Sequence, residues 1–125
     1  TLSLNGQDNM RIKMTIKGRT AVATLDDTPS ARDFFSQLPL TLALEEYAQT
    51  EKIAYLPRKL TTQAAPEGID PQVGDIAYYA PWGNLAIYYR DFGYSSGLIR
   101  LGRLASGLDT LTAQPSGTLT IEAVK

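Results

Sequence analysis

Residues 74–104 read GDIAYYAPWGNLAIYYRDFGYSSGLIRLGRL, and this stretch decides the fold. Apolar and aromatic residues run through 75–80 and 85–90, on either side of the turn sequence Pro81-Trp82-Gly83-Asn84. Two such runs joined by a short turn predict a β-hairpin. A third apolar run, 96–104, follows after another segment rich in turn residues. The stretch therefore predicts three consecutive strands joined by short turns.

The rest of the chain extends this pattern in both directions. Residues 10–17 (MRIKMTIK) alternate cleanly between apolar and polar, as a half-buried strand does. Thr28 and Pro29 mark a helix start, and Pro39 ends that helix. The other predicted elements are strands at 20–25, 40–45, 53–56 and 118–124 and a helical turn at 106–111. The sequence therefore predicts a mainly β domain, a closed eight-stranded antiparallel barrel with one or two short capping helices.

Two segments fall outside this pattern. Residues 1–9 are polar and are expected to form a flexible N-terminal segment ahead of a single barrel domain at 10–125. Residues 58–74 show no sustained periodicity and predict a long loop, and loops of this length are often functional. The chain begins at Thr1. A removed export signal or a lipoprotein anchor would explain that, and so would a chain boundary, so export and a cytoplasmic location both stay open.

Composition limits the function classes. The chain has 125 residues, a formal net charge of −1 and 20% charged residues. A nearly neutral chain argues against a nucleic-acid partner, because such proteins neutralise phosphates with a basic face. No run approaches the roughly 18 apolar residues of a membrane-spanning helix.

The chain contains no histidine and no cysteine. This excludes Ser–His and Cys–His nucleophile pairs, thiol redox chemistry and the usual zinc sites. A carboxylate-only Mg²⁺ or Ca²⁺ site is not excluded, but no acidic run has the spacing of a calcium loop. We therefore expect no metal and no cofactor, and any catalysis must use the remaining polar residues or the backbone.

Three segments resemble the cyclophilin fold. Residues 28–34 (TPSARDF) are similar to the segment in which a proline opens the first cyclophilin helix. Residues 101–109 (LGRLASGLD) resemble the run Phe-Gly-x-Val-x-x-Gly-Met-Asp before the second helix, and 119–124 resemble the closing strand. The compact size and the stretch 74–104 look closer still to the bacterial cyclophilin-like family, over about residues 10–125. The resemblance implies the barrel more firmly than any activity.

Cyclophilins rotate X–Pro bonds, whose uncatalysed barrier is about 18–20 kcal/mol. The resemblance implies an apolar proline pocket and an arginine that hydrogen-bonds the proline nitrogen in the twisted state. The cyclophilin signature Phe-His-Arg, followed by Gln and Gly-Gly-Asp, is not present. Only Arg58 and Gln63 can stand in for its arginine and glutamine. Isomerase activity is therefore in doubt.

The candidate groove residues are Tyr55, Arg58, Trp82, Phe92 and Tyr94. Each has a structural alternative: Arg58 as a solvated surface side chain, and Tyr55 and Phe92 as core or cross-strand aromatics. The paired tyrosines of 78–89 are interpreted mainly as barrel wall, with one tyrosine of each pair facing inward. Trp82 differs because a tryptophan in a hairpin turn either folds back as a lid or stays exposed, and exposed aromatics often mark binding sites.

Three functions follow from these observations. The leading hypothesis is a binding domain for a peptide or protein segment, including proline-containing ones, or for a small ligand, with weak or no isomerase activity. The alternative is an active peptidyl-prolyl cis/trans isomerase that uses Arg58. The third is a different small barrel that stacks nucleic-acid bases or sugars on its aromatics. The nearly neutral charge disfavours the third.

Overall fold

The computed structural model describes residues 10–47, 50–90, 93–113 and 116–124. Ten strands and two helices lie within these ranges. In chain order they are β1 (Arg11–Ile16), β2 (Arg19–Leu25), α1 (Pro29–Ser36), β3 (Leu40–Tyr47), β4 (Glu51–Tyr55), β5 (Gly68–Ile69), β6 (Asp75–Tyr79), β7 (Asn84–Tyr88), β8 (Ser95–Ser96), β9 (Leu98–Ser106), α2 (Leu108–Thr112) and β10 (Gly117–Ala123).

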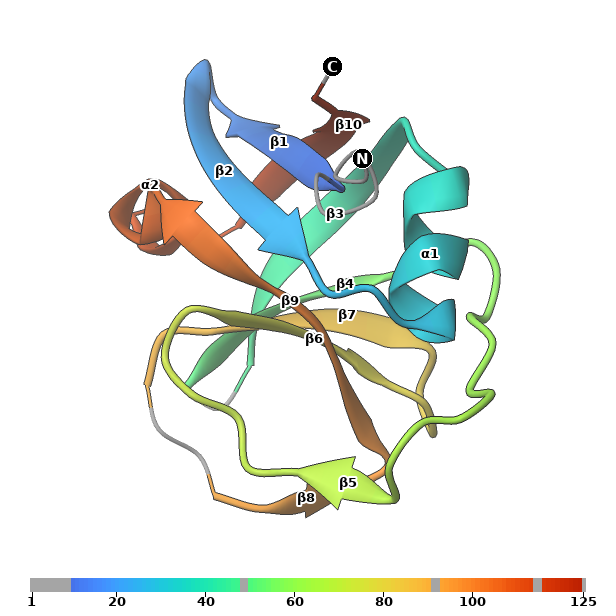
Figure 1. Ribbon diagram of the computed structural model, residues 1–125. Helices are drawn as coiled ribbons and strands as arrows, with labels where there is room; N and C mark the ends of the chain where they lie inside the picture. The colour runs from blue at the N-terminus through green and yellow to red at the C-terminus, as the bar shows by residue number, and fades with distance from the viewer. Residues whose placement is uncertain (1–9, 48–49, 91–92, 114–115, 125) are drawn as a thin grey trace.

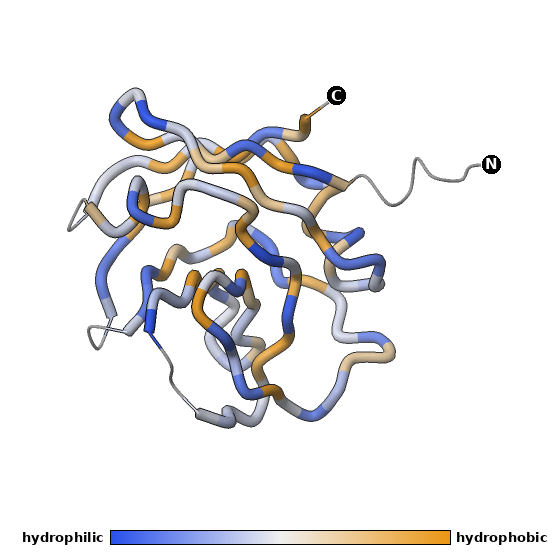
Figure 2. The backbone as a smooth tube through the Cα atoms, turned by 60° about the vertical axis from the view of Figure 1, so that its left-hand side comes forward, coloured by the Kyte–Doolittle hydropathy of each residue, from blue (hydrophilic) through white to orange (hydrophobic). Residues whose placement is uncertain are grey.

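Eight strands form one closed barrel in the order β1-β10-β3-β4-β7-β6-β9-β2 (Figure 1). Neighbouring strands are antiparallel, so the predicted eight-stranded antiparallel barrel with two short helices is confirmed. The alternation that predicted β1 places Ile12, Met14 and Ile16 in the core and leaves Arg11 and Lys13 exposed. In Figure 2 apolar and polar segments alternate over short distances along the chain, as strands with one buried face require.

Helix α1 begins where the sequence predicts. Thr28 is the N-cap, and its Oγ1 accepts a hydrogen bond from the Ala31 N–H at 3.2 Å. Pro29 occupies the first helical turn, and Phe34 is fully buried in the barrel core. The helix lies against β9 (Figure 1). It therefore covers part of the barrel and keeps its polar face in solvent.

A small two-stranded sheet, β5 with β8, lies outside the barrel (Figure 1). Residues 58–74 are therefore not wholly a loop, because β5 lies inside them. The sequence did not predict β5, because this strand pairs with the distant β8 and is too short to show any periodicity. Ile69 of β5 packs against a second buried cluster on the outer face of the barrel wall, made of Ile53, Ala77, Ala86, Tyr88 and Leu98.

No helix among the described residues is long and apolar enough to span a membrane.

Candidate functional site

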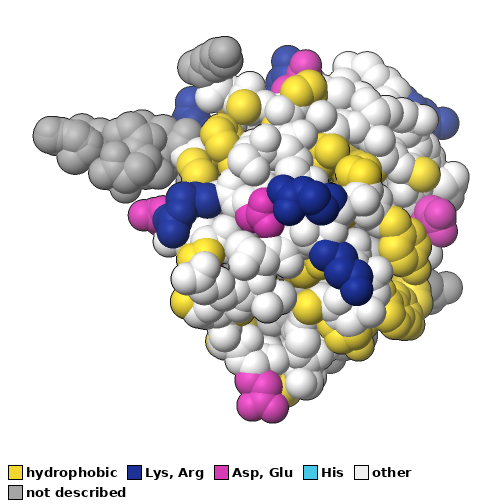
Figure 3. Space-filling model, turned by 90° about the vertical axis from the view of Figure 1, so that its right-hand side faces the viewer, with side chains coloured by type: hydrophobic (Ala, Val, Ile, Leu, Met, Phe, Trp, Pro, Cys, Tyr) yellow, Lys and Arg dark blue, Asp and Glu magenta, His cyan; other side chains and the backbone are white. Residues whose placement is uncertain are grey.

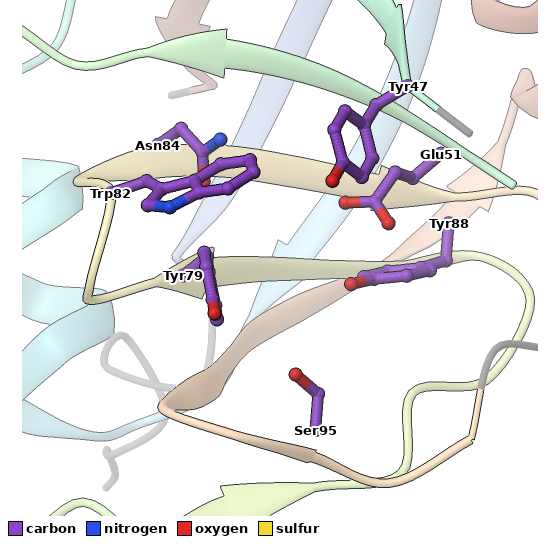
Figure 4. A pocket seen from close by; sticks show the side chains of 7 residues that line it. All are labelled: Tyr47, Glu51, Tyr79, Trp82, Asn84, Tyr88 and Ser95. Carbon is purple, nitrogen blue, oxygen red and sulfur yellow. The ribbon is translucent and has the colours of Figure 1, made fainter.

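A pocket of about 110 Å³ opens on the outer face of the barrel wall (Figure 4). Strands β3, β4, β6 and β7 supply most of its side chains, and the β6–β7 turn and β8 supply the rest. The lining residues are Tyr47, Glu51, Tyr79, Trp82, Asn84, Tyr88 and Ser95. Four of these seven side chains are aromatic. We call it the aromatic pocket.

Strand register brings the first group of lining residues together. Tyr47 pairs with Glu51 across β3 and β4, and Glu51 pairs with Tyr88 across β4 and β7. Residues directly opposite each other on neighbouring strands point to the same face of a sheet. Tyr47, Glu51 and Tyr88 therefore form one row, and in Figure 4 their polar ends point toward the same space.

A second row crosses the same face four residues away along β7. Tyr55 pairs with Asn84, and Asn84 pairs with Tyr79. A strand rises about 3.4 Å per residue, so the Cα atoms of Asn84 and Tyr88 are roughly 13 Å apart. Ala86 lies between them on this face and is small. The two rows therefore form opposite ends of an elongated pocket.

The side chain of Trp82 contacts both rows, Tyr47 in the first and Tyr79 in the second. The turn that carries it is tight: the N–H groups of Trp82 and Gly83 both donate to the Tyr79 carbonyl, at 3.2 and 2.9 Å. Gly83 takes a φ of 71°, which side chains other than glycine rarely adopt. The Trp82 ring meets Tyr47 and Tyr79 edge-on, with centroids 5.5 and 5.3 Å apart and ring planes at 84° and 81°. Trp82 thus folds back over the sheet and remains 47% exposed.

Glu51 is the acidic group of the pocket and is only 6% exposed. Burial raises the pKa of its carboxyl to about 7, and the negative charge of Glu46 adds to the rise. A hydrogen bond from the Tyr88 hydroxyl opposes the rise, since it stabilises the carboxylate. Burial and the same carboxylate raise the pKa of Tyr88, which therefore stays a hydrogen-bond donor. Glu51 changes charge near neutral pH, when most carboxyls are already ionised.

Asn84 is 1% exposed, and its side-chain Oδ1 has no hydrogen-bond partner among the described residues. A buried acceptor without a donor costs about 1–3 kcal/mol. Such groups in native proteins call for an explanation, and a ligand that supplies the donor is one. Asn84 lines the aromatic pocket, but this oxygen is itself buried, so a bound molecule can donate to it only if neighbouring side chains move aside.

The described residues contain no cluster of three or more carboxylates that could hold a metal ion. The pocket offers one carboxyl, an amide oxygen, hydroxyls and aromatic faces. These groups bind and orient a molecule, and nothing in the set is an activated nucleophile.

The residues predicted from the sequence do not all meet at this pocket. Trp82 lines it. Tyr55 is 54% exposed and lies in the same row as Asn84, beside the pocket rather than in its wall. Tyr94 is 63% exposed next to β8. Phe92 lies outside the described residues.

Arg58 lies elsewhere and is engaged by helix α1. Its Nη2 donates to Oδ1 of Asp33 at 2.6 Å, and Asp33 also accepts the Thr61 N–H at 2.8 Å. The Arg58 hydrogen bond lowers the pKa of Asp33, because it stabilises the carboxylate. On the face that carries α1, basic and acidic side chains lie close together (Figure 3). The side-chain contacts of Arg58 therefore tie the loop after β4 to the helix.

Gln63 lines a different cavity, of about 270 Å³, at the start of α1. Asp26, Asp27, Thr28, Pro29, Ser30, Ala64, Ala65, Pro66, Ile69, Ile99 and Arg100 form the rest of its wall. The structure therefore separates Gln63 and Arg58 from Trp82, and the described members of the predicted set do not form a single groove.

Six lining residues were not predicted: Tyr47, Glu51, Tyr79, Asn84, Tyr88 and Ser95. Tyr79 and Tyr88 belong to barrel strands, as expected, but they face outward and also line the pocket. The pair Tyr78 and Tyr79 has one tyrosine inward and one outward, as the alternation predicts. Tyr78 is 1% exposed in the core, where its hydroxyl accepts the Leu60 N–H at 3.1 Å. The alternation along β6 and β7 could have identified Tyr79 and Tyr88, because it places an aromatic side chain on the outer face of each strand.

Comparison with known proteins shows which family the chain resembles. A family model described as the cyclophilin-like family matches residues 14–122. Among solved structures, the chain is similar to the solution structure of the hypothetical protein AF2241 from Archaeoglobus fulgidus, with a TM-score of 0.69 and 16% identity over 94% of this chain and 96% of that chain. At this identity the likeness shows a shared fold. No protein with a curated description matches.

Proposed function

Because this chain belongs to the cyclophilin-like family, we propose that it is a binding domain with weak or no prolyl isomerase activity. Its ligand is a peptide segment or a small molecule that enters the aromatic pocket. The observation that carries this proposal is a pocket in which four aromatic side chains surround two buried polar groups. These are Glu51 and the Oδ1 of Asn84, which has no hydrogen-bond partner in the part of the chain that the structure describes. A mostly apolar pocket with a few convergent polar groups is the usual form of a ligand site.

The position of Arg58 supports weak or absent catalysis. An isomerase must point its donor at the proline nitrogen while an apolar pocket holds the ring. Arg58 instead donates to Asp33, and it lines neither the aromatic pocket nor the cavity at the start of α1. Releasing Arg58 for a substrate would leave the Asp33 carboxylate without its cationic partner.

The proposal is tested with ¹⁵N-labelled protein, titrated with a proline tetrapeptide and a panel of small amines, alcohols and acids. We expect at least one probe to shift the Trp82 indole N–H together with the amides of Glu51 and Asn84. Tyr88→Phe should weaken that binding, because it removes a hydroxyl from the pocket. Tyr89→Phe is the matched control, because Tyr89 lies outside the pocket. Shifts confined to the surroundings of Arg58 and Asp33, or no shift with any probe, would overturn the proposal.

The same tetrapeptide serves in an isomerisation assay. We expect its cis/trans relaxation to keep the uncatalysed rate, or to speed up only slightly, even at high protein concentration. The alternative function through Arg58 requires strong acceleration that Arg58→Ala abolishes while the circular dichroism spectrum stays unchanged. That pair of results would replace the binding domain with an isomerase.

A further inference from the structure

We propose that the aromatic pocket recognises an alkylammonium group, with the positive charge at the Glu51 end and a hydrogen-bond donor of the ligand at the Asn84 end. This inference rests on the proposed function and specifies the chemistry of its ligand. The chemistry is that of a free alkylamine or of a lysine residue in a peptide.

The charge of the pocket favours a cation. Glu51 is the acid among its lining residues. Glu46 on the neighbouring strand adds a smaller negative potential, which its ion pair with Lys52 at 3.0 Å partly offsets. No lysine or arginine among the described residues lines the pocket. An anion would be repelled by the Glu51 carboxylate, and a neutral apolar ligand would bury that carboxylate further without adding a positive charge to its hydrogen bond from Tyr88.

The aromatic rings favour the same ligand class. Tyr47 and Tyr79 each stand nearly perpendicular to Trp82, so the three rings present surfaces in different directions around one space (Figure 4). Aromatic faces carry negative potential and attract ammonium groups, and combinations of such rings are used in proteins to bind organic cations. The alkyl part of the ligand would pack on the same rings.

The distance between the polar groups sets the length of the ligand. Glu51 lies in the row of Tyr88, and Asn84 lies four residues away along β7. The rows are roughly 13 Å apart at the Cα atoms, so the two polar groups belong to different ends of the pocket. A ligand with an ammonium at one end of an alkyl chain and an amide N–H at the other would satisfy both groups. The pocket volume of about 110 Å³ is that of a small organic group, since a cavity of about 150 Å³ holds benzene.

The inference is tested by NMR titration at pH 8 with n-butylammonium and its neutral analogue 1-butanol. We expect n-butylammonium to bind about tenfold or more tightly, with shifts at the Trp82 indole and at Glu51. N-acetyl-lysine N-methylamide separates the two ligand sources. Tighter binding of this compound, with an added shift at Asn84, indicates a peptide lysine, and equal or weaker binding indicates a free amine.

Equal binding of the amine and the alcohol would overturn the cation inference and leave the proposed pocket standing. Binding of neither, while the tetrapeptide or an acid of the panel shifts the same resonances, would also overturn only this inference. If nothing in the panel binds, the proposed function fails with it.

A charge-removing variant adds a second readout. Glu51→Gln should reduce the preference for n-butylammonium over 1-butanol to about twofold or less, because the carboxylate supplies most of the attraction. Glu122→Gln makes the same change on β10, where Glu122 pairs with Lys13 at 3.7 Å, and should leave the preference unchanged. An unchanged preference in a folded Glu51→Gln protein would overturn the role of Glu51.

The unmodified protein provides a test that needs no variant. The titratable groups facing Glu51 are Tyr47 and Glu46 of β3, Tyr79 of β6 and Tyr88 of β7, and Glu46 is ion-paired with Lys52 at 3.0 Å. Ionisation of Glu51 near pH 7 should raise the affinity for n-butylammonium about tenfold between pH 6 and pH 8. The affinity for 1-butanol should stay flat. A flat profile for the amine would contradict the proposal.

Discussion

At the scale of single residues, Glu51 carries a conflict between stability and binding. The strand pairing of β3, β4 and β7 buries its carboxyl under aromatic side chains, where ionisation is unfavourable. The tyrosine hydroxyl of Tyr88 offsets part of this cost. A position that destabilises the folded chain when charged is typical of a functional site.

The destabilising effect of the Glu51 charge can be tested by measuring the stability of Glu51→Gln as a function of pH. The pKa of Glu51 rises from 4.5 in the unfolded chain to about 7 in the folded one. Between these values the folded state binds more protons than the unfolded state, so the free energy of unfolding falls as pH rises. The penalty is absent below about pH 4 and complete above about pH 7, where it reaches up to about 3 kcal/mol.

The variant lacks this penalty. In urea unfolding, the stability of Glu51→Gln relative to the unmodified protein should therefore be greater at pH 8.5 than at pH 4.5. Glu122→Gln, at an exposed position, should show no such change with pH. The same relative stability of Glu51→Gln at both pH values would show that the Glu51 carboxyl is not destabilised by burial.

At the scale of elements, the small β5–β8 sheet supports one side of the aromatic pocket. Ser95 belongs to β8 and lines the pocket, and β8 is held by β5 and by the hydrogen bond from the Gly97 N–H to the Glu67 carbonyl at 2.7 Å. The two strands approach so closely at Gly68 that a Cβ there would lie 2.3 Å from the Ser95 carbonyl oxygen. Glycine is therefore required at this position by contact with the facing backbone.

Gly68→Ala should separate β5 from β8. We expect a loss of about 1–3 kcal/mol of stability, in the range of overpacked sites. We also expect faster amide hydrogen exchange at Gly97 and weaker binding in the pocket, because Ser95 moves. Gly117→Ala is the control, since the nearest atoms to its added Cβ belong to side chains and not to backbone, with Ile16 Cδ1 at 3.0 Å. Unchanged exchange at Gly97 in Gly68→Ala would contradict the supporting role of the small sheet.

At the scale of the whole molecule, each barrel strand pairs with two neighbours, so we expect the eight strands to unfold together. Strand β10 lies between β1 and β3 and carries Leu119 and Ile121, both fully buried. The first and last strands, β1 and β10, thus pair with each other and close the wall. Loss of packing in β10 is therefore expected to weaken the whole barrel, including the wall that carries the pocket.

Ile121→Ala should lower the free energy of unfolding by about 2–5 kcal/mol, the range for emptying a core site of this size. This is a large fraction of the roughly 5–15 kcal/mol of a typical domain. Thr120→Ala, half-buried on the other face of β10, should cost less than about 1 kcal/mol. Trp82 fluorescence and circular dichroism should report one coincident transition for Ile121→Ala. Two separate transitions would show that the pocket wall unfolds independently.

Local patterns predicted much of this structure. The alternation of β1, the cap of α1 and the turn at Pro81–Asn84 were readable because each depends on neighbours within a few residues. The β5–β8 pairing was not readable, because two-residue strands leave no period in the sequence. The proposed roles of Tyr55, Arg58, Gln63, Phe92 and Tyr94 in a binding site remain predictions.

The sequence by itself determined the eight barrel strands, the short helices and Trp82 as an unusual turn residue, because burial of one strand face imposes a two-residue period. It did not determine β5 and β8. Only the tertiary structure decided which polar groups meet. Glu51 and Tyr88 are 37 positions apart in the printed numbering, and cross-strand register alone places them side by side. The ion pair between Arg58 and Asp33 likewise joins residues that are far apart in the sequence. A ligand site built by register has no local signature, because its residues become neighbours only when the barrel closes.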